Sequence, residues 1–336
     1  MNARTRLHAL LDGFAGRRVL LFGDLVVDRF ILGTPKRISR EAPVIILHFE
    51  EQRDLPGGGA NAVANVAALG GEAVPVGVVG DDEAGRSLLV LLASLAIDIT
   101  GVLVAPGHRT VTKVRLLAGG AAALRHQVAR YDVECTAPDD APWRGELLSR
   151  LTTLARDSAV AAVSDYGYGV VTTASLAALR ASLPATALVV ADSRFALRSL
   201  HGVDGATPNL EELAGDAGRD LASDADVARA AESLRAELGA RFVAATRGNR
   251  GLTLVEPGRP PLHLPAFGSG QVADVTGAGD TVLAALALSL AAGASPAEAA
   301  VLANLAGGVV VMKLGTATVS RDELHRAVEL APFLDE

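Results

Sequence analysis

Short apolar segments rich in valine alternate along this chain with segments in which apolar residues recur at helical spacing. The segments that resemble strands are Arg18–Gly23, Ala73–Gly80, Ala159–Ser164, Ala187–Asp192 and Phe242–Thr246. The segments with helical periodicity among them are Asn61–Leu69, Glu83–Leu95, Thr172–Leu183 and Ala225–Leu238. Apolar strands separated by helices are typical of a parallel sheet that is covered on both faces. The pattern predicts a three-layer α/β fold with a central, mostly parallel sheet between helices.

Two regions interrupt this alternation, Phe30–Glu51 and His108–Tyr131. Within the second, apolar and polar residues alternate from Thr110 onward, and Gly119-Gly120 is suited to a hairpin turn. We expect both regions to form extra strands of a small β lid, within about residues 29–52 and 108–131. No repeat, low-complexity tract or linker divides the chain, so a single domain over residues 1–336 is predicted.

The composition favours a soluble protein that acts on small molecules. Of the 336 residues, 50% are apolar and 21% charged, which is enough to bury a large core, and the net charge of −7 argues against a nucleic-acid partner. Cys135 is the only cysteine, so the sequence predicts no internal disulfide and a cytoplasmic location. The N-terminal residues do not suit an export signal, and the uncharged stretch 281–297 is interpreted as a buried helix because it is short for a membrane span.

The segment Asp274-Val-Thr-Gly-Ala-Gly-Asp280 places a carboxylate where a glycine turn becomes an apolar helix. The small residues Gly277, Ala278 and Gly279 leave backbone N–H groups uncovered, and the helix dipole favours an anion there. A carboxylate beside a bound phosphoryl group is useful if it accepts the proton of an attacking hydroxyl. The motif therefore suggests phosphoryl transfer to an alcohol, although a tight turn with a favourable first-turn aspartate is the alternative.

A second glycine cluster, 57–59, precedes Asn61 and a helical segment. Gly57, Gly59 and Ala62 match part of a dinucleotide fingerprint, but the preceding residues 50–54 do not resemble the end of a buried strand. The better interpretation is that bare backbone at Gly58 approaches a sugar closely and that Asn61 hydrogen-bonds a hydroxyl. A glycine-rich helix start without a ligand remains the alternative.

Polar residues that follow the predicted strands should converge on one rim, because ligands of open parallel sheets bind beyond the carboxyl ends of the strands. Asp24 and Asp28, after the first strand, could accept hydrogen bonds from adjacent sugar hydroxyls, or belong to a solvated turn. If the substrate carries a phosphate, positively charged side chains must bind it. The candidate cations are Arg37, Lys113, Arg115, Arg130 and Arg194.

The two glycine motifs, in this order, resemble the signatures of the ribokinase/PfkB family of sugar kinases, and the resemblance extends from the first strand to Lys313-Leu-Gly-Thr316. Further segments resemble the branch of D-glycero-β-D-manno-heptose 7-phosphate 1-kinases, of the stand-alone kinase type. These segments are Gly23-Asp24, Asp28-Arg29, Arg37–Val44, Thr112–Arg115, Arg130–Asp132, Ser164–Tyr166 and Thr207–Asn209. Two positions depart from that branch. Asp192-Ser193-Arg194 replaces its usual Asp-Pro-Lys, so a phosphate would meet the planar guanidinium group of an arginine in place of the compact ammonium group of a lysine. Arg40 replaces a proline of the lid.

The resemblance implies roles for further residues. Asp280 would be the general base toward the γ-phosphoryl group of ATP, with Gly277, Ala278 and Gly279 as the anion hole. Asn209 and Glu212 would organise Mg²⁺ through water, or would simply cap a helix. Thr246, Gly248 and Asn304 would contact the nucleotide, with packing as the alternative for Asn304. In the family, backbone near Asp274 and Thr276 can hold a monovalent cation, with K⁺ as the candidate, and the sequence leaves this open.

A two-stranded lid exposes strand edges, so pairing of two lids across a two-fold axis predicts a homodimer. Three rival functions stay open at this point. They are a kinase acting on a different sugar or sugar phosphate, a sugar-binding regulator without catalysis, and a dehydrogenase that uses the Gly57 cluster.

Overall fold

The central sheet contains the apolar strands that the sequence pattern predicted, together with several short strands at its edges. The computed structural model describes residues 2–119, 126–268 and 272–335. Nine strands of this part are hydrogen-bonded in the order β13-β12-β11-β10-β9-β8-β1-β4-β5. They are β1 (Arg18–Gly23), β4 (Glu72–Gly80), β5 (Val102–Ala105), β8 (Val160–Asp165), β9 (Leu188–Ser193), β10 (Gly205–Ala206), β11 (Phe242–Thr246), β12 (Leu252–Val255) and β13 (Leu262–Leu264). Neighbours from β11 to β5 run parallel, and β12 and β13 are antiparallel.

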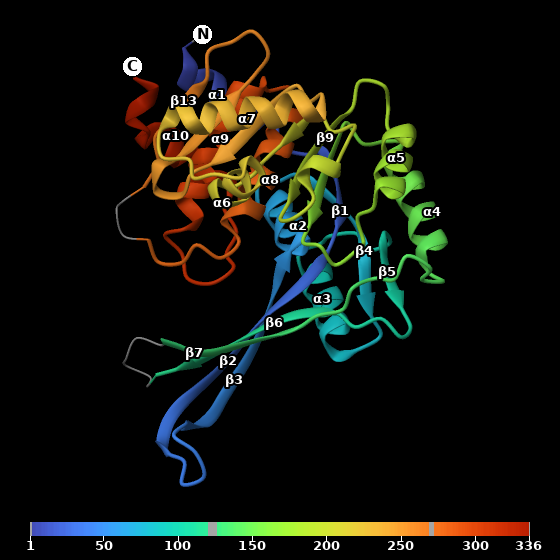
Figure 1. Ribbon diagram of the computed structural model, residues 1–336, viewed down its shortest axis with the longest axis vertical. Coiled ribbons are helices and arrows are strands. Elements are labelled where there is room, and N and C mark those ends of the chain that lie inside the picture. Colours follow the sequence, from blue (N-terminus) through green and yellow to red (C-terminus); the bar gives the residue numbers. More distant parts are fainter. Residues whose placement is uncertain (1, 120–125, 269–271, 336) are drawn as a thin grey trace.

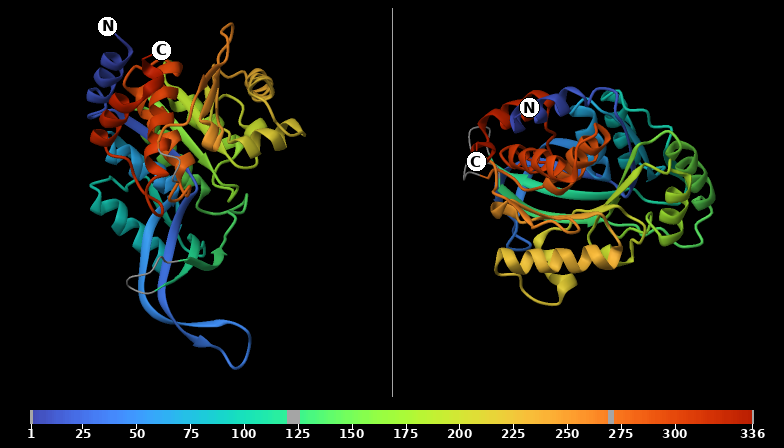
Figure 2. Two further views of the ribbon diagram at one scale, coloured as in Figure 1. Left: turned by 90° about the vertical axis from the view of Figure 1, so that its left-hand side faces the viewer. Right: turned by 90° about the horizontal axis from the view of Figure 1, so that it is seen from above.

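Helices cover both faces of this sheet, as the three-layer prediction requires (Figures 1 and 2). One face carries α1 (Ala3–Asp12), α2 (Gly59–Ala68), α3 (Glu83–Ser94), α8 (Ala278–Ala291), α9 (Pro296–Val310) and α10 (Arg321–Leu330). The other carries α4 (Arg144–Ala155), α5 (Thr173–Ser182), α6 (Leu210–Ala217) and α7 (Asp224–Leu238). Short 3₁₀ turns occur at η1 (Leu197–Ser199), η2 (Gly248–Arg250) and η3 (Pro332–Leu334).

Strand β1 shows how alternate side chains of one strand are buried in the two cores on opposite faces of the sheet. Val19 and Leu21 are buried in the core below α2 and α8, while Leu20 and Phe22 are buried in the opposite core below α4 and α5. Since successive side chains of a strand point to opposite faces, a strand between two helical layers must be apolar at every position. This requirement explains why the buried strands read as continuous apolar runs.

The uncharged stretch 281–297 is buried only as far as residue 290, and it spans two helices and not one. Helix α8 ends at Ala291, and the turn that follows contains Gly293 with a φ of +85°. Ser295 then caps α9 in a capping box with Glu298, and Pro296 occupies the first turn. Among the residues that the structure describes, no helix is both long and apolar enough to cross a membrane.

The predicted lid is a second sheet of four strands in the order β3-β2-β6-β7. Its strands are β2 (Leu25–Ile38), β3 (Ile45–Gly58), β6 (Val111–Ala118) and β7 (His126–Val133). Strand β2 begins before the predicted boundary, because Leu25, Val26 and Val27 are buried where the lid joins the body. The antiparallel pairing of β6 with β7 agrees with the expected hairpin, whose Gly120 lies outside the described residues.

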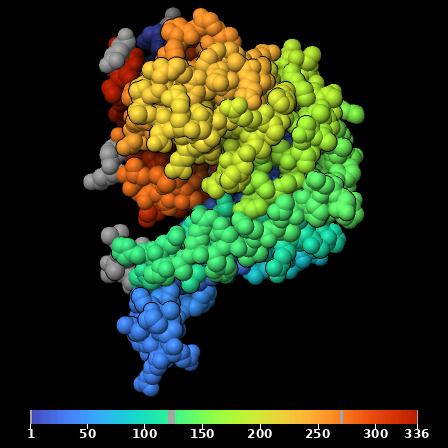
Figure 3. All heavy atoms as spheres, viewed as in Figure 1, coloured from blue at the N-terminus to red at the C-terminus, as the bar shows by residue number. Residues whose placement is uncertain are grey.

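The hairpin of β2 and β3 projects from the body at the end opposite the two termini (Figures 1 to 3). Strand β3 is mostly exposed, pairs antiparallel with β2 and leads directly into α2. The glycine cluster 57–59 therefore does not follow a buried strand of the parallel sheet. The context that a dinucleotide fingerprint needs is absent, as the sequence indicated.

Candidate active site

The glycine turn before α8 combines a left-handed N-cap with two backbone N–H groups for which the described residues provide no acceptor. Gly277 forms the N-cap with a φ of +77°, and a Cβ there would lie 2.4 Å from Nδ2 of Asn61, so only glycine fits. The N–H of Ala278 makes a long bond of 3.3 Å to the carbonyl of Val275. Within the described part of the chain we find no acceptor for the N–H groups of Gly277 and Gly279. The turn can therefore receive an anion at the positive end of α8.

Asp280 is held in the first turn of α8 with only 2% of its surface exposed. The hydroxyl of Tyr166 donates to its Oδ1 at 2.8 Å, and Nδ2 of Asn61 donates to its Oδ2 at 3.2 Å. The same nitrogen also donates to the carbonyl of Gly277 at 3.2 Å. Oδ1 of Asn61 accepts from Nδ2 of Asn65 at 3.1 Å. Both carboxylate oxygens are thus oriented by a neutral donor, and each keeps a free lone pair.

The environment of Asp280 makes its carboxylate unusually basic. Burial raises its pKa from 3.8 to about 7, and the negative charge of Asp28 acts in the same direction. The hydrogen bonds from Tyr166 and Asn61 and the positive charge of Lys113 lower the pKa against this trend. A carboxylate with a pKa near neutrality suits general-base catalysis better than an exposed aspartate.

The two aspartates predicted to meet a sugar differ in how much of their bonding capacity is used. Asp24, 1% exposed, accepts at Oδ2 from the N–H groups of Tyr166 at 2.7 Å and Tyr168 at 3.2 Å. Its buried Oδ1 has no hydrogen-bond partner among the described residues, and burial raises its pKa to about 6. Asp28 instead accepts from Arg115 at 2.6 Å and from Thr316 at 2.7 Å. Asp24 therefore has an acceptor to offer a ligand, whereas both oxygens of Asp28 already have protein partners.

The five candidate cations differ in whether they are near the site and in whether a carboxylate already pairs with them. Arg115 is buried against Asp28, and exposed Arg130 makes a bidentate pair with Asp132 at 2.8 and 2.6 Å. Arg37 pairs with Ile46 in the distal hairpin, beyond the segment of β2 that contacts β6. Lys113 and Arg194, by contrast, both lie against the ring of Tyr166, at 4.5 and 5.0 Å from its centroid.

Lys113 is a buried cation without a carboxylate partner among the described residues. The residue is 6% exposed, and its ammonium group lies over the ring of Tyr166. Burial lowers its pKa, and the neighbouring positive charge of Arg194 lowers it further. A cluster of two cations that repel each other is stabilised by a bound anion, so this corner fits a phosphate.

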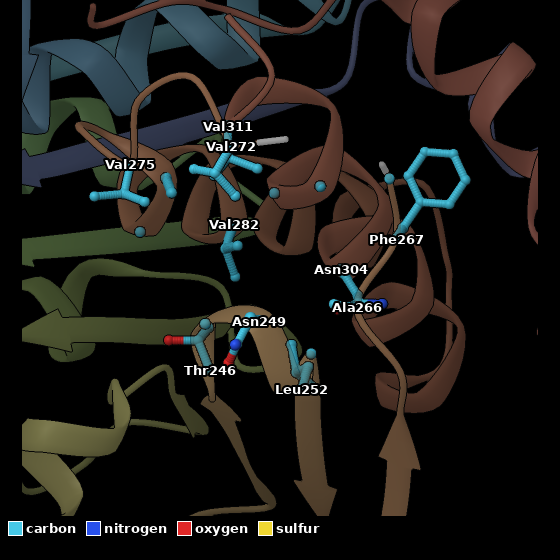
Figure 4. A pocket seen from close by; sticks show the side chains of 17 residues that line it. Thr246, Asn249, Leu252, Ala266, Phe267, Val272, Val275, Val282, Asn304 and Val311 are labelled. Carbon is cyan, nitrogen blue, oxygen red and sulfur yellow. The ribbon is translucent and has the colours of Figure 1, made fainter. Parts of the chain in front are cut away.

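The residues predicted for the nucleotide line one cavity of about 500 Å³ (Figure 4). Thr246, Gly248 and Asn304 lie in its wall together with Ala278 and Gly279 of the glycine turn. Apolar side chains that sequence reasoning did not identify complete the wall, including Phe267, Val272, Val275, Val282 and Val311. Nδ2 of Asn304 also donates to the carbonyl of Pro265 at 2.8 Å, so this amide has a packing role in addition. A mostly apolar cavity of this size, with residues of the glycine turn in its wall, has room for a nucleotide.

Asn209 and Glu212 form a reciprocal capping box at the start of α6, which was the alternative interpretation. Oδ1 of Asn209 accepts from the N–H of Glu212 at 2.9 Å, and the carboxylate of Glu212 accepts from the N–H of Asn209 at 2.8 Å. Burial raises the pKa of Glu212. Asp192, at the end of β9, has its pKa raised to about 8 by burial and by the charges of Glu212 and Asp280.

This convergence of carboxylates would favour a cation, although it does not form a direct ligand cage. Among the described residues no group of three His, Cys, Asp or Glu side chains is close enough to hold a metal. Mg²⁺ commonly keeps several of its waters and is bound through few protein groups. Asp192, Asn209 and Glu212 therefore fit a metal held through water.

Asp274 connects two chain segments beside the glycine turn. Its Oδ1 accepts from the N–H of Thr276 at 2.9 Å, and its Oδ2 accepts from the N–H of Gly315 at 3.1 Å. The predicted K⁺ position is thus a place where backbone of residues 274–276 and 315 is held together by a carboxylate.

Tyr166 is the main site residue that sequence reasoning did not assign. It follows directly after β8, where the rim was expected, and a phenol alone gives no chemical signal in a sequence. Its position beside Gly58 becomes visible only in the fold, since a Cβ on Gly58 would lie 3.2 Å from the tyrosine ring.

A three-layer α/β fold, a glycine turn with a buried carboxylate and an adjoining cavity of about 500 Å³ suit a phosphotransferase with an alcohol as acceptor. The model of the pfkB family carbohydrate kinases matches residues 17–323, and the chain belongs to this family. The chain is 42% identical over 325 residues to the bifunctional protein HldE of Caulobacter sp. strain K31, and 43% identical over 314 residues to that of Azotobacter vinelandii. These alignments cover 95% and 93% of this chain, but 64% and 63% of the relatives, so the chain spans less than two thirds of their length.

Solved structures of low sequence identity share the fold. Phosphofructokinase-2 from Escherichia coli in complex with potassium is 20% identical, with a TM-score of 0.76 over 96% of this chain and 100% of that one. Ribokinase of Arabidopsis thaliana, complexed with ribose and ATP, is 20% identical, with a TM-score of 0.72 over 94% of this chain and 99% of that one. At this identity the likeness establishes the ribokinase-like fold.

Proposed function

We propose that this carbohydrate kinase transfers the γ-phosphoryl group of ATP to a sugar hydroxyl, namely O1 of D-glycero-D-manno-heptose 7-phosphate. The observation that carries the proposal is the placement of Asp280 between two donors at the mouth of the glycine turn, next to the cavity of Thr246 and Asn304. The choice of sugar rests on the segments of the lid and rim that resemble heptose 7-phosphate kinases.

Asp280 acts as the general base. Its carboxylate accepts the proton of the sugar hydroxyl as that oxygen forms a bond to the γ-phosphorus, while the bond from the γ-phosphorus to the bridging oxygen of ADP breaks. The N–H groups of the turn 277–279 stabilise the charge on the transferred group. Above a pH of about 7 most molecules carry the ionised form of Asp280, which is the form that can accept a proton.

The acceptor is bound between Asp24 and the cation pair. Oδ1 of Asp24, which has no partner among the described residues, accepts a hydrogen bond from a sugar hydroxyl, and Gly58 lets Tyr166 pack closely against the backbone beside it. Lys113 and Arg194 bind the 7-phosphate, since both are without a carboxylate partner among the described residues. Asn61, Asp28, Arg115 and Arg130 then support the site mainly through their protein contacts.

The metal and nucleotide complete the proposal. Asp192, Asn209 and Glu212 would hold Mg²⁺ through water, and Mg²⁺ supplies charge neutralisation on the phosphates when bound. K⁺ would be held by backbone carbonyls near Asp274 and Thr276, a position that Asp274 makes rigid.

We propose further that the protein is a cytoplasmic homodimer joined through the lid. The distal hairpin exposes large apolar side chains, and apolar area of this kind on a sheet invites pairing. They are Ile38, Val44, Ile45 and Phe49, which are 69%, 55%, 55% and 60% exposed. The single cysteine supports a reducing compartment.

The test is release of ADP from Mg-ATP in a screen of sugars and sugar phosphates that includes heptose 7-phosphate. Turnover of this sugar with the highest kcat/KM supports the proposal, and preference for an unphosphorylated sugar contradicts the substrate assignment. Asp280→Asn should lower kcat by about 10²- to 10⁴-fold while leaving the affinity for an ATP analogue unchanged. If Asp280→Asn retained the rate of the unmodified enzyme, the role of the base would be refuted.

A further inference from the structure

One aromatic residue contacts several parts of the proposed acceptor side of this site. Tyr166 follows β8, and its backbone N–H is held by Oδ2 of Asp24 at 2.7 Å. Its ring lies beside Gly58, and its hydroxyl donates to Oδ1 of Asp280 at 2.8 Å. Lys113 and Arg194, for which the described residues supply no carboxylate partner, both lie over the same ring.

The direction of the hydrogen bond to Asp280 is fixed by chemistry. Burial and the nearby charges of Asp280 and Asp192 raise the pKa of Tyr166 well above its usual value. The phenol therefore keeps its proton and donates at any pH at which the enzyme would work. Tyr166 cannot replace Asp280 as the base, but it can orient the carboxylate and stabilise its ionised form.

The contacts of the ring connect this carboxylate with the place where an acceptor phosphate would bind. A cation over an aromatic face is attracted by the ring quadrupole, and the attraction is strongest where water is excluded, as it is around Lys113. The ring gives Lys113 and Arg194 a common platform despite their mutual repulsion. A phosphate seated on both cations is then placed at a fixed position relative to the base.

We propose that Tyr166 is a positioning residue of the phosphoryl-transfer reaction, which orients the carboxylate of Asp280 through its hydroxyl and the phosphate-binding cations Lys113 and Arg194 through its ring. The inference rests on the proposed role of Asp280. It assigns two separable functions to one side chain, so that loss of the hydroxyl and loss of the ring have different consequences.

The first experiment measures the titration of Asp280 directly and needs no substrate. Protein labelled with ¹³C at the aspartate carboxyl carbons is titrated by NMR, and the Asp280 signal is identified by its loss in Asp280→Asn. In Tyr166→Phe the midpoint of Asp280 should rise by about one pH unit, because the carboxylate loses a donor that favours its charged form. The matched control is Tyr168→Phe, whose hydroxyl contacts Glu134 and not Asp280, and whose Asp280 midpoint should stay unchanged.

A second variant controls for the possibility that Tyr166→Phe shifts the midpoint of Asp280 through a change of packing. Replacement of Tyr166 by 3-fluorotyrosine keeps the hydroxyl and makes it a stronger donor, so the midpoint of Asp280 should move downward. An unchanged midpoint in both Tyr166 variants, or an equal shift in Tyr168→Phe, would overturn the proposal.

Kinetics with heptose 7-phosphate and Mg-ATP then separate ring from hydroxyl. Tyr166→Phe should lower kcat by about tenfold with KM within twofold of its original value, whereas Tyr166→Leu should also raise KM for the sugar phosphate by about tenfold. An equal KM in the two variants contradicts the role of the ring. If Asp280 is not the base, Asp280→Asn will retain phosphoryl transfer. The link from Tyr166 to Asp280 is tested separately, by the NMR titration alone.

Discussion

Nδ2 of Asn61 donates a hydrogen bond to Oδ2 of Asp280 at 3.2 Å across a sequence separation of 219 residues. This contact joins the two glycine motifs, since the same nitrogen also reaches the carbonyl of Gly277. Asn61 was expected to contact a sugar hydroxyl. That contact stays a prediction. The amide also bonds to the protein through both its nitrogen and its oxygen, so we infer that Asn61 fixes the carboxylate of Asp280 and the glycine turn relative to each other.

The proposed role of Asp280 as general base predicts a defined pH dependence of the reaction. With a pKa of about 7, the carboxylate becomes protonated as the pH falls, and the protonated form cannot accept the proton of the sugar. We expect kcat/KM to be constant above about pH 8 and to fall about tenfold per pH unit below about pH 6. The pH profile of ADP release measures this, and a profile that is flat between pH 5 and 8 would contradict it.

Removing the charge of Lys113 or Arg194 should weaken binding of a phosphorylated acceptor and leave binding of ATP unchanged. We expect Lys113→Met and Arg194→Met each to raise KM for heptose 7-phosphate by about ten- to a hundredfold, because each takes away a charge-assisted hydrogen bond. Lys36→Met is the matched control, since Lys36 lies on the exposed part of β2. An unaltered KM in both site variants would show that the phosphate is bound elsewhere.

Gly277 should be intolerant of any side chain, for two reasons that can be separated. Its φ of +77° costs an L-residue about 1–2 kcal/mol, and its Cβ would collide with Nδ2 of Asn61. Gly293, with a φ of +85° and open space around it, shares only the first cost. We expect Gly277→Ala and Gly293→Ala both to lower the free energy of unfolding in urea, and only Gly277→Ala to lower kcat. Equal activity of the two variants would argue against a functional turn.

The exposed side chains of the distal hairpin lead to a prediction about assembly. Phe49→Asp should shift the protein from dimer to monomer at micromolar concentration in light scattering, because a buried carboxylate without a partner opposes association. Val90→Asp, at a side chain of α3 that is 68% exposed, should leave the mass unchanged. A monomeric mass of the original protein would refute the proposed dimer.

The layered fold was predictable because buried parallel strands must be apolar at every position. The bounds of β1 and β11 agree with the sequence prediction for this reason. Strands such as β10, with two residues, and β13, with three, carry too few residues for a pattern. They exist because neighbouring strands supply hydrogen-bond partners, which a local sequence does not reveal.

Within the site, the chemistry of single residues was easier to predict than their partners. Asp280 and its turn stand out in the sequence because the helix start and the glycines are contiguous. The five cations look equivalent there, and only the folded structure shows that Arg115, which pairs with Phe30 in the β2–β6 ladder, reaches across to Asp28. Tyr166 was not assigned since its partners come from five distant segments of the chain.

The buried carboxylate of Asp280 should also cost the protein stability at the pH where it works. Its pKa in the folded state, about 7, lies above the ordinary value of 3.8, so the folded state binds the proton more tightly than the unfolded state. The stability that this group contributes is fully present below about pH 4 and is lost as the pH rises through about 7. We therefore expect Asp280→Asn to raise the free energy of unfolding at pH 8 by about 1–3 kcal/mol, since the shift of the pKa sets an upper bound of this order. Urea unfolding at pH 8 and pH 5 measures the effect. The gain should shrink at pH 5, where the carboxyl is protonated, and an equal gain at both pH values would mean that it comes from packing and not from the charge.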